Sequence, residues 1–138
     1  MKATLLIGDY ARVAEGKLDV IGGGWSMIQP QGPFGFFVAV LIQVPWDQAN
    51  RKHTLRLDLL DADGQTIATP GGEDVVHAQG EFEAGRPAGV TPGTPLDIPF
   101  VVPFGPLVLA GGRYEIRLTI DDETREDWYL AFTVNPTA

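Results

Sequence analysis

The stretch GRYEIRLTIDDETREDWYLAFTV, residues 112–134, decides the fold of this chain. From Tyr114 to Ile120, apolar side chains occupy every second position and alternate with charged or polar ones. After the acidic turn DDET the alternation returns, with apolar residues at Trp128, Leu130, Phe132 and Val134. A period of two is typical of a strand with one face in a core and the other in water. The stretch therefore predicts an antiparallel β-hairpin.

Shorter apolar segments follow one another along the rest of the chain, separated by 17 glycines and 11 prolines. This spacing is typical of an all-β sandwich. Pro99 and Pro103 lack backbone donors, so we expect the strand that contains them to be bulged or at a sheet edge. Besides the hairpin, the pattern predicts strands at residues 3–8, 17–28, 34–44, 52–60, 65–68, 74–84 and 96–104.

The predicted fold class is all-β: a single antiparallel β-sandwich of roughly seven to nine strands, immunoglobulin-like or C2-like. The chain has 138 residues, and we expect residues 1–138 to form one domain. Residues 83–95 are predicted to be a loop that crosses between the sheets, because neither side of it has enough strands for a core of its own.

Composition narrows the classes of function. The chain contains no cysteine, which excludes disulfides, thiolate metal sites and thiol nucleophiles. It is acidic, with a net charge of −8, and its ten basic residues are scattered, so we expect no binding to nucleic acid or to a membrane surface. Its apolar runs are shorter than the ~18 residues of a spanning helix, and no signal-peptide core is present. These features predict a soluble, cytoplasmic protein.

The run VIGGGWSM, residues 20–27, allows two interpretations. A phosphate-binding glycine loop is followed by a helix, but Pro30 and Pro33 forbid one here. The alternative is a bulge or tight bend at Gly22–Gly24, which would let a strand change sheets and turn Trp25 into the core. The flanking residues favour the bend.

No residues group into a recognisable catalytic site. His53 and His77 have no partner at metal-ligand spacing, and we expect both at the surface. Ser26 is the only serine and lies outside any nucleophile motif. We therefore predict no catalytic residue, no cofactor and no enzyme activity.

Loop aspartates suggest an alternative function. Asp61, Asp63, Asp121 and Asp122 all lie in predicted turns, and sandwiches of the C2 type bind calcium through clustered loop aspartates. Aspartate is also an ordinary turn residue, and dense aspartate pairs are lacking. The sequence therefore favours turn formation and predicts no metal.

The predicted strand at residues 34–44 is apolar on both faces. Phe37, Ala39 and Leu41 point away from the side that Phe36 shares with the core. Such a second face marks a protein interface, as in a homodimer, or is covered by a loop such as residues 83–95. Trp46, in a connection, is a further interface candidate or a carbohydrate platform.

Three long stretches carry a family resemblance. LLIGDYARVAEGKLDVIGGGWSMI, VPWDQANRKHTLRLDLLDADG and the run from GRPAGVTPG to LAFTV resemble a family of small uncharacterised bacterial proteins, a domain of unknown function found in high-GC bacteria. The resemblance implies no catalytic residues. The C-terminal hairpin is also similar to the closing strands of immunoglobulin-like modules, which says little about function.

These observations lead to a ranked expectation. We expect a non-catalytic protein-binding or assembly module that forms a homo-oligomer or binds another protein. The alternative is a ligand-binding β-sandwich of the calcium-dependent or carbohydrate type. An enzyme of unrecognised type comes third.

Overall fold

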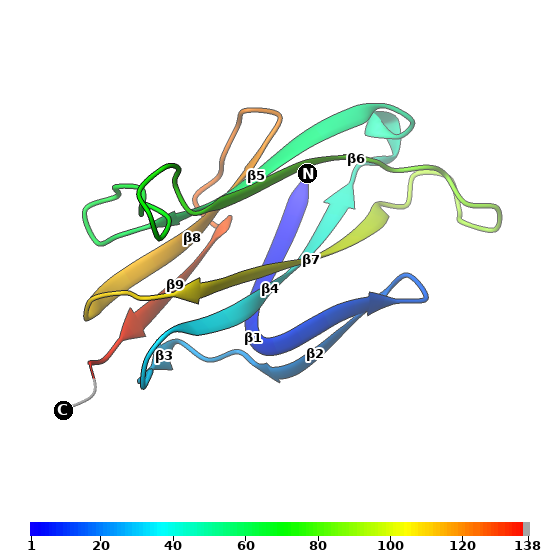
Figure 1. Ribbon diagram of the computed structural model, residues 1–138. Helices are drawn as coiled ribbons and strands as arrows, with labels where there is room; N and C mark the ends of the chain where they lie inside the picture. Colours follow the sequence, from blue (N-terminus) through cyan, green and yellow to red (C-terminus); the bar gives the residue numbers. More distant parts are fainter. Residues whose placement is uncertain (137–138) are drawn as a thin grey trace.

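The computed structural model describes residues 1–136 as two β-sheets that pack face to face (Figure 1). The four-stranded sheet has the order β2-β1-β4-β7, and the five-stranded sheet has the order β3-β9-β8-β5-β6. The described strands are β1 (Lys2–Ala14), β2 (Lys17–Gly23), β3 (Met27–Ile28), β4 (Phe34–Val44), β5 (Lys52–Leu60), β6 (His77–Glu83), β7 (Leu96–Leu107), β8 (Gly112–Ile120) and β9 (Tyr129–Val134). The predicted all-β sandwich is confirmed.

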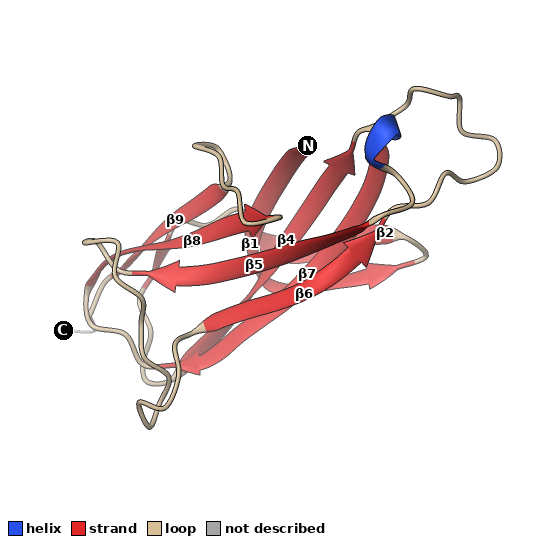
Figure 2. Cartoon of the chain, turned by 90° about the horizontal axis from the view of Figure 1, so that it is seen from above, coloured by secondary structure: helices blue, strands red, loops and turns tan. Residues whose placement is uncertain are grey.

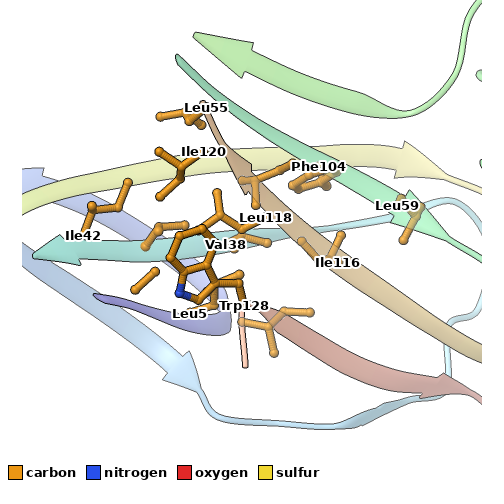
Figure 3. Close-up of a cluster of buried hydrophobic side chains, with 14 of the residues drawn as sticks. Leu5, Val38, Ile42, Leu55, Leu59, Phe104, Ile116, Leu118, Ile120 and Trp128 are labelled. Atoms are coloured by element: carbon orange, nitrogen blue, oxygen red, sulfur yellow. The ribbon is translucent and has the colours of Figure 1, made fainter. Parts of the chain in front are cut away.

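The inward side chains of both sheets form one hydrophobic core (Figure 3). Val38 and Ile42 of β4 meet Ile116 and Leu118 of β8 in this cluster, and all four are fully buried. Alternate residues of each strand supply the core, as the period of two requires. The hydrophobic effect therefore joins the two sheets directly.

The decisive C-terminal hairpin, β8 with β9, is confirmed; the tip of its connection is a two-residue turn, and residues 123–128 lie between this tip and β9. Asp121 and Asp122 have φ angles of 51° and 63°, and the flanking Ile120 and Glu123 bond to each other in both directions. Positive φ at both central residues is the mark of a type I′ turn, which matches strand twist. Trp128 and Phe132 are buried, as predicted.

Strand boundaries follow the predictions closely in the middle of the chain and less well elsewhere. The predictions for residues 34–44 and 52–60 match β4 and β5. β1 and β7 are longer than predicted, β6 is shorter, and residues 65–68 make only isolated bridges. β7 lies at a sheet edge, as its prolines predict. Among the described pairs, β3 and β9 are parallel, which corrects the wholly antiparallel expectation.

The strand order and one side-chain hydrogen bond of this sandwich can be compared with those of immunoglobulin domains. The order β1-β4-β7 opposite β9-β8-β5 follows the A-B-E and G-F-C order of immunoglobulin sandwiches. The Tyr114 hydroxyl donates a hydrogen bond of 2.7 Å to the carbonyl of Ala110, as a tyrosine corner does. Burial, and then the charge of Asp61, raise the pKa of Tyr114. This likeness of topology carries no function.

The glycine run is a bend between the two sheets. Gly22 and Gly24 have φ angles of 62° and 89°, in the left-handed region that glycine adopts without strain, which confirms the predicted bend. The chain leaves the four-stranded sheet at Gly23 and enters the five-stranded sheet at Met27. Between them, the Trp25 ring packs edge-on against core aromatic rings, those of Phe36 and Phe132. The predicted change of sheet is therefore confirmed.

The loop after β6 joins the two sheets, as predicted. It leads from β6 in the five-stranded sheet to β7 in the four-stranded sheet and projects beyond the ends of the strands (Figure 2). Arg86 in this loop donates two hydrogen bonds, of 2.6 and 3.2 Å, to the carbonyl of Trp46, and its guanidinium lies 4.6 Å from the Trp46 ring centre. The loop is thereby tied to the end of the sandwich.

We predict that Gly24→Ala lowers the free energy of unfolding by about 1–2 kcal/mol, because an L-residue resists the left-handed backbone at this position. Gly80→Ala is the control, since Gly80 has no positive φ and an added Cβ there meets nothing within 4 Å. It should be neutral or stabilise by up to ~1 kcal/mol. Urea unfolding measures both, and equal effects would contradict the bend.

Candidate functional site

The outward face of β4 is covered by a part of β1 and β2 that we call the arm, residues 9–23. β1 pairs with β4 only as far as Gly8, and from there it pairs with β2. In the hydrogen-bonded order of the sheet, β1 is two strands away from β7 and β2 is three strands away. Even so, Cα atoms of β1 and of β2 lie within 8 Å of Cα atoms of β7. Strands in a flat sheet would be ~10–14 Å apart at that separation. The arm therefore folds over the outward face of the sheet. In Figure 1 it is seen below β4 and β7.

Burial confirms where the arm lies. Ala11 of the arm and Ala39 of β4 are 3% and 2% exposed, yet neither belongs to the core between the sheets. The Tyr10 ring centre lies 5.1 Å from that of Phe37, on the outward face of β4. At the bend, a Cβ on Gly8 would lie 2.8 Å from a methyl group of Val20, so glycine permits this close approach. A small secondary contact layer thus lies outside the main core.

This arrangement corrects the prediction for the two-faced strand. Phe37 and Leu41 are half-buried and Ala39 is buried, so Ala39 is closed to a partner. Within this chain the cover over Ala39 is the arm and not the loop at residues 83–95, and a second chain over the half-buried Phe37 and Leu41 stays a prediction. Sequence reasoning missed it because residues 9–14 were not expected to continue the first strand. The available signal was the two-residue spacing of Tyr10 and Arg12, together with Asp19, whose charge is opposite to that of Arg12.

The arm also carries exposed apolar side chains, Tyr10 and Ile21 on one side and Val13 on the other. Tyr10, Val13 and Ile21 are 46%, 44% and 64% exposed. Among the described residues, four of the seven large exposed hydrophobic side chains lie on β1 or β2; these are Leu6, Tyr10, Val13 and Ile21. A salt bridge of 2.9 Å between Arg12 and Asp19 spans the two strands beside them. The exposed apolar surface is concentrated here.

The outer face of the five-stranded sheet has the opposite character. Arg56 pairs with Asp58 at 2.9 Å, and Arg117 pairs with Glu115 at 2.6 Å. The register places these side chains on the solvent side of β5 and β8. This face is a solvated surface with paired charges, in contrast to the arm.

Trp46 lies away from the outward face of β4, in the 3₁₀ turn Trp46–Gln48. It lines an open hollow of about 520 Å³ with Met1, Lys2 and Pro95. Arg86 occupies one face of the indole ring, so that face is not free to stack on a sugar. The structure does not bring Trp46 together with Phe37, Ala39 and Leu41.

The four calcium candidates lie at opposite ends of β5. Asp61 follows β5, and its Oδ1 accepts backbone N–H groups of Asp63 and Gln65, both at 2.9 Å. Asp121 bonds to Thr54 near the other end of β5, with Asp122 beside it. The intervening register separates the two pairs by ~20 Å. Within residues 1–136, no group of three or more His, Asp or Glu side chains forms a metal-binding cluster.

His53 is buried, which corrects its predicted surface position. Its side chain stacks on Phe82, with ring centres 5.2 Å apart, and the residue is 4% exposed. Nδ1 lies 2.7 Å from Asp121 Oδ2, and Nε2 lies 3.0 Å from the Gln48 carbonyl. Both partners are acceptors, so the imidazole satisfies both contacts only when it carries two protons. His77 is half-buried and bonds to the Val75 carbonyl at 2.9 Å.

The carboxylate of Asp121 is bonded through both oxygens. Besides His53, it accepts the Thr54 backbone N–H at 2.9 Å. Partial burial raises the pKa of Asp121, but the hydrogen bonds from His53 and Thr54 and the charges of His53 and Arg51 outweigh it and lower the pKa from its usual 3.8. These residues tie the last hairpin to the start of β5.

Comparison with known proteins gives the family. A family model described as a family of unknown function, DUF6941, matches residues 3–133. The chain belongs to this family. The match covers the arm, both sheets and the last hairpin, as the sequence resemblance to an uncharacterised domain implied. No curated protein matches the chain.

The DUF6941 fold is built of strands alone apart from one 3₁₀ turn in the described residues. In that part of the chain, no helix has the length and apolar character needed to cross a bilayer. The family match assigns no activity, so the function must be argued from the surface of the molecule.

We predict that the stabilising effect of Asp121 depends on pH. A carboxyl whose pKa is lower in the folded state stabilises the fold above its unfolded pKa, and this is lost as the pH falls through the folded value. Asp121→Asn should therefore reduce stability near neutral pH, and its deficit should close below about pH 4. Asparagine tolerates the positive φ of the turn.

Urea unfolding of both proteins at several pH values measures this difference. Asp122→Asn is the matched control, because Asp122 shares the turn and the positive φ. A deficit for Asp121→Asn that stays constant down to about pH 2 would contradict the role of the carboxylate charge.

Proposed function

We propose that this DUF6941 protein is a non-catalytic protein-binding or assembly module and that the arm is its contact surface. The observation that carries the proposal is the concentration of exposed apolar side chains on the arm, at the directly paired Tyr10 and Ile21 on one side and at Val13 on the other. Contiguous exposed apolar surface in a soluble protein marks an interaction site. Each Å² that a partner removes from water contributes ~25 cal/mol.

The contrast between the two sides of the molecule supports this choice. The five-stranded sheet presents paired charges to solvent, such as Arg56 with Asp58, as a surface adapted to water does. The arm has a salt bridge between Arg12 and Asp19, and its other exposed positions combine large apolar groups with the charged residues Asp9, Glu15 and Lys17. Ile21 is 64% exposed, so folding does not require an apolar group at this position, whereas the Tyr10 ring also packs on Phe37 of the sheet.

The non-catalytic part of the proposal is supported by how the chemically capable side chains are used. Both ring nitrogens of His53 and both carboxylate oxygens of Asp121 are bonded within the fold. Asp61 holds its own turn through backbone N–H groups. These side chains serve the structure, and their hydrogen-bonding capacity is directed inward.

A photo-crosslinking residue in place of Tyr10 tests the proposed function. We expect p-benzoylphenylalanine at this position to give a defined protein adduct in cells that make the protein. The matched control is the same replacement of Tyr129, which is 40% exposed on the outer face of the five-stranded sheet. Mass spectrometry identifies the adduct, and Ile21→Lys should abolish it by placing a charge beside Tyr10.

The result that contradicts the proposal is equally defined. Adducts of equal yield from the positions of Tyr10 and Tyr129, or an adduct at Tyr10 that Ile21→Lys leaves unchanged, would show that the arm is not a contact surface. Circular dichroism of each variant confirms that the sheets are intact.

A further inference from the structure

We infer that the arm pairs with the arm of a second copy of this chain, β2 edge against β2 edge, antiparallel about a twofold axis at Leu18. This inference rests on the proposed function, in which the arm is the contact surface, and it names the partner. A symmetric contact of this kind joins the same patch on both copies. The pairing is argued from the edge, the register and the charges of the arm.

The edge of β2 is suited to accept another strand. An edge strand presents unpaired backbone N–H and C=O groups, and proteins block such edges with proline or like charge. The β7 edge contains Pro99, Pro103 and Pro106, and β6 carries Glu81 and Glu83, which would repel a second acidic copy. β2 contains no proline, and its two charges, on Lys17 and Asp19, have opposite sign.

The tip of the arm is accessible. The side chains of Arg12 and Asp19 are 62% and 50% exposed, and Val13 next to them is 44% exposed. These residues lie in the half of the arm near the turn between β1 and β2, at the far end from the bend at Gly8. In this half of the arm β2 is the outer strand, and Lys17 and Leu18 are its first residues.

The register within the arm makes the pairing self-complementary. Arg12, Val13 and Ala14 pair with Asp19, Leu18 and Lys17, respectively. With the axis at Leu18, Lys17 of each copy lies opposite Asp19 of the other. Each Asp19 is then flanked by its own Arg12 and by the second copy's Lys17, and opposite charges in directly facing positions stabilise a sheet.

The same axis continues an apolar row across the contact. Val13 and Leu18 of one copy would face Leu18 and Val13 of the second copy, in four adjacent strands. Moving the axis by one residue, to Asp19, would place two like charges opposite each other, which is destabilising. Charge therefore selects the register at Leu18 over its neighbour.

The size of the contact indicates a transient dimer. Stable complexes bury ~1,200–2,000 Å² of accessible surface, and pairing of one short strand stays well below this range. The net charge of −8 on each copy opposes association further. We expect a dissociation constant of roughly 50–500 µM.

A charge-exchange experiment tests the pairing by sedimentation velocity of the purified chain up to ~1 mM, well above the expected dissociation constant. The unmodified protein should show a concentration-dependent dimer. Lys17→Glu and Asp19→Lys should each weaken self-association at least ~5-fold, because each places like charges opposite each other. An equimolar mixture of the two variants should associate again. In that mixed dimer the introduced glutamate faces the introduced lysine, and the unchanged Asp19 of one variant faces the unchanged Lys17 of the other.

Lys52→Glu, which makes the same change of charge on β5, is the control for net charge and should weaken association less than Lys17→Glu. A monomeric unmodified protein at ~1 mM, or a mixture that stays monomeric, would overturn the inference. Circular dichroism and urea unfolding show that each variant is folded. An adduct between the Tyr10 position and a different protein, together with a monomeric chain, would remove the second copy as partner and leave the proposed function intact.

Discussion

The apolar character of β4 on both faces is the constraint on which the rest of the structure depends. A strand with large apolar groups on both faces needs a layer of protein against each face to remove those groups from water. Val38 and Ile42 are buried against the five-stranded sheet, and Ala39 is buried on the other side beneath the arm. An ordinary sandwich leaves its outer faces wet. Here a local third layer, made from the first strands of the same chain, replaces that water over part of one face.

Glycine makes this third layer possible. The arm begins where Gly8 ends the pairing of β1 with β4, and it ends in the bend at Gly22–Gly24. At Gly8 the missing side chain leaves room for Val20, and at the other end positive φ angles redirect the chain to the five-stranded sheet. The arm is thus held between two backbone bends, with its turn and tip directed outward. That geometry leaves one side of the arm against the sheet and the other exposed.

Polar interactions at the ends of the sandwich serve a different purpose. His53 and Asp121 connect the start of β5 to the last hairpin, and Arg86 fixes the crossing loop to Trp46. These contacts hold the loops at the ends of the strands. A family of unknown function with this distribution of groups is better understood from its surface than from a search for a reactive centre.

The sequence by itself determined the strands, the sandwich and the last hairpin, because a period of two is a local property that survives in the fold. It also showed that β4 is apolar on both faces and that Gly22–Gly24 bends the chain. Only the tertiary structure decided what covers the second face of β4 and where His53 lies. Cover and burial depend on contacts between segments far apart in the chain: the arm with β7, and His53 with Asp121. Alternation states which residues share a face of a strand, but it carries no information about which segment packs against that face.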